Sequence, residues 1–192
     1  MPNDRRKVMP GKPKIGGCAS RAPLGTALPA NETVVLPAAY KPQGYLDAEG
    51  VSRSIKRAFS SLKAYGGDEV LNVRTEHSVA VKFNLLEVLN SEVQSTVWGS
   101  DVTVTPASSS AGTKIALAYS GEEQPESVWV FEFAYKSKVK RIVFPIAQIV
   151  TADFTENYKD DSLVSYPVEL ACYPDANGKY FYEYADDGLK TA

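Results

Sequence analysis

The residues from Val73 to Leu85 alternate between two kinds of side chain, and this pattern constrains the fold more than any other in the chain. The two sets are Val73, Thr75, His77, Val79, Val81, Phe83 and Leu85 against Arg74, Glu76, Ser78, Ala80, Lys82 and Asn84. Successive side chains of a strand point to opposite faces. The pattern therefore predicts a long strand with one face on a core and the other facing water or a partner.

Other segments extend this interpretation to a mainly β fold. Alternating or apolar runs predict strands at 51–58, 102–105, 114–119, 129–135, 139–150, 163–173 and 180–184, the last two paired through the tight-turn dipeptide Asn177-Gly178. Residues 59–70 are expected to form a loop around Gly66 and Gly67. Pro145 interrupts its strand, so we expect a bulge or an edge there.

A single helix is predicted near residues 85–98. Asn84 followed by Glu87 resembles a capping box at its start, and Gly99 can end it. Leu85, Leu89 and Val93 repeat at helical spacing. The helix is expected to cover one face of the sheet.

The chain divides into an extended, Pro-rich N-terminal arm at 1–43, a β domain at 44–188 and a short tail at 189–192. Residues 1–21 carry six basic residues and one acidic residue, which leaves 15 basic and 22 acidic residues, a formal charge of −7, in the remainder. The arm lacks apolar periodicity, so we expect it to be flexible or ordered by a partner, with only Thr33 to Leu36 able to form a short strand. No secretory signal or membrane-spanning run is recognised, which predicts a protein made in the cytoplasm.

No residue cluster indicates enzymatic chemistry, a metal or a cofactor. The one histidine, His77, lies on the apolar side of its strand and is expected to be a packing or interface residue. Cys172 is expected to be a small core residue, and its spacing from Cys18 fits neither a metal nor a redox motif. The aromatic stripe Trp129, Phe131, Phe133 and Tyr135 is expected to be core, because a nucleic-acid platform needs a basic groove and this body is acidic.

A resemblance to a known family rests on the segment that reads GYLDAEGVSRSIKRAFSSLKAYGGDEVLNVRTEHSVAVKFNLLEVLNSEVQSTVWG, residues 44–99, and on the later stretch VELACYPDANGKYFYEY. A Gly-aromatic turn, a strand, a loop ending in Gly-Gly-Asp, an alternating strand and a helix closed by Trp-Gly follow one another. This order is similar to the major tail tube proteins of long-tailed, siphovirus-type bacteriophages. The resemblance implies a β-sandwich or barrel-like fold with a flanking helix.

The resemblance also implies a function as a structural protein of the virion tail. Its members form hexameric rings that stack into the tube for DNA delivery. The implied partners are the protein itself, the tape measure protein, tail assembly chaperones, the tail terminator, the distal tail protein and phage DNA that passes without specific binding. Alternatives are a baseplate hub, a head-tail connector or a capsid decoration protein.

Two sets of residues become candidates for this function. Lumen-facing candidates are Arg74, Glu76, Lys82 and Glu132, and ring-stacking loop candidates are Leu62, Tyr65, Gly66, Gly67 and Asp68. The resemblance adds the N-terminal arm at 1–33 and the region beyond Asp186 as stacking segments. The charge of −7 outside residues 1–21 motivates the hypothesis of an acidic lumen that does not hold DNA.

Overall fold

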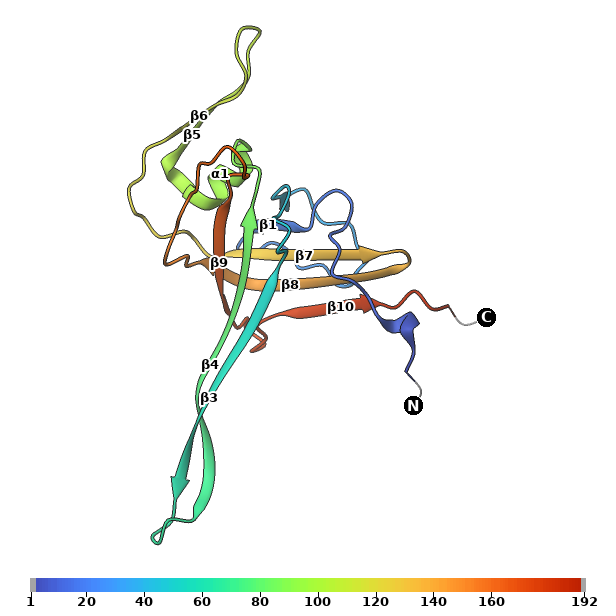
Figure 1. Cartoon of the computed structure of the whole chain (residues 1–192), viewed down its shortest axis with the longest axis vertical. Helices are drawn as coiled ribbons and strands as arrows, with labels where there is room; N and C mark the ends of the chain where they lie inside the picture. The colour runs from blue at the N-terminus through green and yellow to red at the C-terminus, as the bar shows by residue number, and fades with distance from the viewer. Residues whose placement is uncertain (1–2, 191–192) are drawn as a thin grey trace.

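The computed structural model describes residues 3–190 and shows a mainly β fold with one short α-helix (Figure 1). The strands in chain order are β1 (Ala19–Pro23), β2 (Lys41–Pro42), β3 (Ser52–Lys63), β4 (Glu69–Leu85), β5 (Val102–Thr105), β6 (Lys114–Leu117), β7 (Ser127–Tyr135), β8 (Lys138–Ile149), β9 (Tyr166–Tyr173) and β10 (Tyr182–Asp186). The helix is α1 (Ser91–Trp98), and two short 3-10 turns occupy Arg5–Lys7 and Gly99–Asp101. The mainly β prediction is confirmed.

The main sheet is antiparallel and open, with the strand order β2-β1-β7-β8-β9-β4-β3, while β10 pairs with β8 alongside this path. The sheet folds over itself, because Phe83 of β4 contacts Trp129 and Phe131 of β7 with ring centroids 5.5 and 5.3 Å apart. Figure 1 shows β3 and β4 running across the direction of β7 and β8. This arrangement is that of an orthogonal sandwich built from one continuous sheet.

Pro145 lies where the sheet divides. Residues 139–143 of β8 pair with β10, and residues 146–149 pair with β9. In the pairing of β7 with β8, Ser127 lies opposite Ala147 and Trp129 lies opposite Phe144. The step between these two pairs is two residues in β7 and three in β8, so β8 has one extra residue, and the expected bulge lies at this proline. The predicted pairing of 163–173 with 180–184 is wrong, because β9 and β10 both pair with β8 at this fork.

The core lies on both faces of β7 and β8. Trp129, Phe131 and Phe144 belong to the larger cluster, which β4, β9 and α1 complete. Val130 and Val143 face the opposite way and pack with residues from the first 43 positions and from β10: Ala22, Leu36, Tyr40, Tyr182 and Tyr184. The aromatic stripe is therefore core at Trp129 and Phe131, and β7 is buried on two faces.

The N-terminal region is part of the domain, which corrects the prediction of an extended arm at 1–43. β1 pairs with β7 through five residue pairs, and Cys18, Ala19 and Ala22 are buried. Residues 33–36 form no strand. The reason is that the edge of β7 offers backbone hydrogen bonds to β1, and the composition of residues 1–43 gives no information about this distant partner.

The helix begins later than predicted. Leu85 is the last residue of β4, and Asn90 caps α1 by accepting the N–H of Glu92 at 3.0 Å. Glu87 does not cap the helix. Its carboxylate accepts the N–H of Tyr45 at 3.0 Å and the Asn90 side-chain amide at 2.8 Å. The predicted end at Gly99 is confirmed, and Gln94 of the helix donates to the Tyr166 hydroxyl at 2.7 Å.

Candidate functional site

The hairpin of β3 and β4 projects far from the body and forms one end of the molecule along its longest axis (Figure 1). The segment predicted as a loop, 59–70, is mostly strand, because pairing continues from Phe59↔Arg74 to Lys63↔Glu69. Only residues 64–68 form the turn, where Gly66 and Gly67 have φ of 109° and 100°. A twelve-residue strand at ~3.3 Å per residue spans about 40 Å.

The outer half of this hairpin, residues 59–73, exposes apolar side chains that no other part of the described chain covers. Tyr65 at the turn is fully exposed. Phe59, Leu62, Val70, Leu71 and Val73 are between 42% and 67% exposed. Contiguous exposed apolar surface marks an interaction site. The stacking candidates Leu62, Tyr65, Gly66, Gly67 and Asp68 thus lie together at the end of the hairpin.

A register shift in the hairpin changes which residues share a face. Ala58 pairs with Glu76 and Phe59 pairs with Arg74, so β4 has one extra residue at Thr75. Directly paired residues share a face, and the extra residue moves Arg74 to the face opposite Glu76. The prediction that Arg74, Glu76 and Lys82 face the same way is therefore wrong for Arg74. Val73 likewise leaves the side that carries Val79 and Val81.

Glu76 and Lys82 share the polar face of the sheet formed by β3, β4 and β9. Lys56 forms an ion pair with Glu76 at 3.1 Å, and Lys82 forms one with Glu169 at 2.9 Å. These side chains are between 31% and 71% exposed. Within the described residues, this face carries two lysines and two glutamates. The face that holds the candidates Glu76 and Lys82 is therefore charge-balanced, whereas the body charge predicted an acidic surface.

Glu132 does not fit the lumen-facing position predicted for it. Its side chain is 12% exposed and binds Lys14 at 2.8 Å and Arg141 at 2.6 Å. Burial disfavours the charged form, but the hydrogen bonds from Lys14 and Arg141 outweigh burial, and the pKa of Glu132 lies below its usual value. This carboxylate therefore holds three segments of the chain together.

Arg141 is the residue that sequence reasoning missed. It is 1% exposed and donates both to Glu132 and to the carbonyl oxygen of Asn31, at 2.5 Å. The two-residue turn between Tyr135 and Lys138 places Glu132 directly opposite Arg141. A hairpin register drawn from that turn would have predicted the pair.

The outer edge of β3 and the β1-facing edge of β7 differ in how they are covered. Within the described residues, β3 pairs only with β4, so one edge of its twelve residues is open. The edge of β7 is covered by β1 along residues 127–131. A long open edge normally pairs with another chain or is protected from doing so.

The histidine and the two cysteines of the described residues pack within the fold. No group of three or more His, Cys, Asp or Glu side chains in the described residues is arranged to hold a metal ion. His77 packs edge-on against Tyr180, with centroids 4.6 Å apart. Cys18 and Cys172 are free and buried, and burial raises their thiol pKa to about 11 and about 12. None of the helices in residues 3–190 has the length and apolar character to cross a bilayer.

No protein-family model matches the chain, and a search of curated proteins finds no significant match.

Proposed function

We propose that this chain is a structural subunit that polymerises as stacked rings and forms the tail tube of a bacteriophage, through which DNA reaches the host. The observation that carries the proposal is the hairpin of β3 and β4, whose outer half exposes apolar side chains on both faces. Such a surface is unfavourable in a free monomer and becomes favourable when another subunit covers it. The resemblance of residues 44–99 to tail tube proteins supports a tail tube as the assembly.

The shape of the subunit supports head-to-tail association. The ribbon of β5 and β6 lies at the end of the longest axis opposite the hairpin tip (Figure 1). Two unlike ends favour a heterologous contact, which repeats without limit along an axis unless it closes into a ring. The open edge of β3 provides a second direction, in which lateral strand pairing closes the ring.

The polar face of β3, β4 and β9 is the surface that we assign to the lumen. Its charges occur as the pairs Lys56–Glu76 and Lys82–Glu169. A protein holds DNA mainly by neutralising phosphates with unpaired Lys and Arg side chains. Lysines that already have carboxylate partners on a charge-balanced face are expected to bind the DNA phosphates only weakly. The tape measure protein would occupy the same lumen before DNA, and the terminator and distal tail proteins would close the two ends.

The test is assembly of the purified protein, followed by negative-stain electron microscopy at increasing concentration. In the matched variant, residues 60–73 are replaced by Asn-Gly. Phe59 and Arg74 are direct pairing partners, so a two-residue turn can close the shortened hairpin without changing its register. We expect hollow tubes from the intact chain, and folded monomers or isolated rings from the variant.

Other outcomes separate the alternatives. Closed oligomers that bind capsids would favour the decoration protein, and a single ring that never stacks would favour a connector. Tubes from the shortened variant would show that the hairpin does not mediate stacking. Circular dichroism and the melting temperature of the variant serve as the folding control.

A further inference from the structure

The N-terminal residues 8–17, which we call the strap, lie along the part of the β7 edge that β1 does not cover. Pro13 pairs with Phe133 in an antiparallel bridge. The Ala134 N–H donates to Lys12 O at 3.0 Å, and the Lys14 N–H donates to Glu132 O at 3.1 Å. The strap thus acts as a short added strand on residues 132–134.

The strap is held by polar contacts and has little apolar packing. Every residue from Pro10 to Gly16 is exposed, and Ile15 is 99% exposed. Its side-chain attachments are Lys14 to Glu132 at 2.8 Å, Lys138 Nζ to the Val8 carbonyl oxygen at 2.6 Å, and Lys12 Nζ over the Tyr135 ring at 5.7 Å from the centroid. The Lys14 side chain is 46% exposed, and Glu132 keeps Arg141 as a partner at 2.6 Å when Lys14 leaves. Such a half-exposed ion pair and a few edge hydrogen bonds hold the strap weakly, so it opens locally while the domain stays folded.

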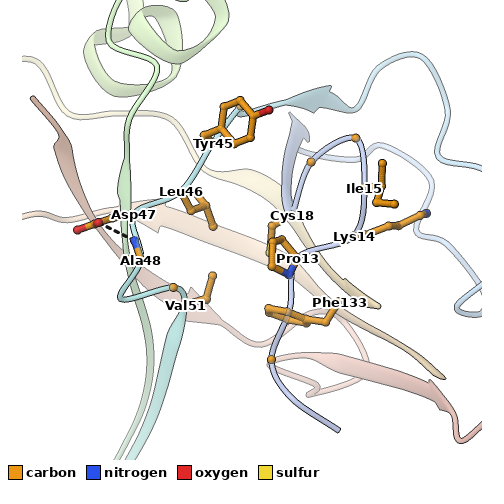
Figure 2. Close-up of a pocket in the computed structure, with 15 residues that line it drawn as sticks. Pro13, Lys14, Ile15, Cys18, Tyr45, Leu46, Asp47, Ala48, Val51 and Phe133 are labelled. Carbon is orange, nitrogen blue, oxygen red and sulfur yellow. Dashed lines mark hydrogen bonds between the residues drawn. The ribbon is translucent and has the colours of Figure 1, made fainter. Parts of the chain in front are cut away.

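A hollow beneath the strap confirms the loose packing. It has a volume of about 510 Å³ and separates the strap from the turn of residues 44–51. Figure 2 shows Pro13, Lys14 and Ile15 on one side of the hollow and Leu46 and Val51 on the other. In contrast, Cys18 at the base of the strap is 5% exposed and belongs to the core.

A flexible joint connects the strap to this fixed base. Gly16 and Gly17 have φ of 97° and 128°, which other residues rarely adopt. A Cβ atom at Gly16 would meet nothing within 4 Å, and at Gly17 the joint carries one turn hydrogen bond, from its N–H to Lys14 O at 3.2 Å. The chain can therefore change direction here without disturbing β1.

We propose that the strap is released from its own subunit during assembly and that the β7 edge at residues 132–134 then binds the strap of a second copy. The occupant is defined by the structure itself, because an identical strap already matches this edge through the same bridge, hydrogen bonds and ion pair. Exchange of an identical segment between copies forms an intermolecular link at low energetic cost. In the free subunit the strap protects the edge from other pairings. The role of strap exchange in assembly rests on the proposed function.

Release is tested on the free, unmodified protein by amide hydrogen exchange. The Ala134 N–H donates to Lys12 O of the strap at 3.0 Å, so its protection from exchange depends on the strap. The nearby Glu132 N–H donates to Cys18 O at 2.7 Å, outside the strap, and serves as the internal control. We expect Ala134 to exchange at least ~10-fold faster than Glu132, because it opens locally. Raising NaCl from about 20 to 500 mM should increase the Ala134 rate several-fold and leave Glu132 unchanged, because salt screens the Lys14 contact. Equal, salt-independent protection of the two amides would overturn the proposal.

Exchange is tested by mixing two single variants, Pro13→Cys and Phe133→Cys, at high protein concentration under mild oxidation. The Pro13↔Phe133 pair is of the non-hydrogen-bonded kind, with a Cα separation of ~4.5 Å that suits a disulfide. A disulfide-linked dimer of one of each variant supports exchange. The double variant Pro13→Cys and Phe133→Cys checks the geometry, because it should form the disulfide within one chain. To control for random collision, Ser108→Cys, which lies in an exposed loop, is mixed with Phe133→Cys in place of Pro13→Cys.

Absence of the mixed dimer above the Ser108→Cys control would overturn exchange, whether or not tubes form. Absence of tubes in the microscope, with the mixed dimer present, would instead count against the tail tube. The two failures are therefore distinguishable.

Discussion

The double substitution Leu62→Ser and Leu71→Ser is expected to weaken assembly strongly and to leave the monomer stable. The two leucines pair across the hairpin and are 50% and 57% exposed. Full burial of a leucine contributes about 1.5–3 kcal/mol, so covering the exposed half of each side chain contributes about 1 kcal/mol. The pair then contributes about 2 kcal/mol per subunit contact, equivalent to about a 30-fold rise in the critical concentration of assembly.

The assay measures the critical concentration by pelleting and light scattering, with urea unfolding of the monomer in parallel. Because both positions are exposed, the free energy of unfolding should change by less than about 1 kcal/mol. Leu163→Ser is the control, since Leu163 is 75% exposed but lies in the loop before β9. The reasoning would be refuted by an unchanged critical concentration in the double variant, or by an equal rise in the control.

Three further predictions concern the subunit itself. Arg141→Met should destabilise the fold by about 3 kcal/mol in urea, because it leaves a largely buried Glu132 with Lys14 as its one remaining cation; a loss below about 1 kcal/mol would contradict the importance of this pair. The pKa of Glu132 is lower in the folded chain than its ordinary value, so its contribution is complete above about pH 4.3 and is lost as pH falls through the folded pKa. Glu132→Gln should therefore flatten the fall in stability as the pH drops below about 4.3, and an unchanged slope there would disprove the linkage. Cys18 and Cys172 should resist thiol reagents at pH 8 in the native protein and react in denaturant, because burial raises both pKa values, and rapid native labelling of Cys18 would show that its core position opens.

Local patterns in the sequence were enough to predict features that depend on neighbours along the chain. The alternation at Val79, Val81 and Phe83 predicted the buried face of β4, and Asn177-Gly178 predicted a turn, closed by the Gly178 N–H to Asp175 O at 2.9 Å. Gly99 marked the end of α1, and Pro145 marked the bulge in β8. Each of these follows from side-chain periodicity or from a backbone preference of a single residue.

Features that depend on distant partners could not be predicted in this way. Residues 12–23 joined the sheet because β7 offers an edge more than 100 positions away, although their own composition predicts no order. The side of the sheet that Arg74 occupies depends on a bulge against β3, which the alternation of β4 alone does not reveal. Glu132 was expected in a lumen and is held by Lys14 and Arg141. A hydrogen bond or an ion pair gains its free energy from the partner that folding brings to it, so composition and periodicity identify the strands, whereas strand pairing decides what each edge and each charge does.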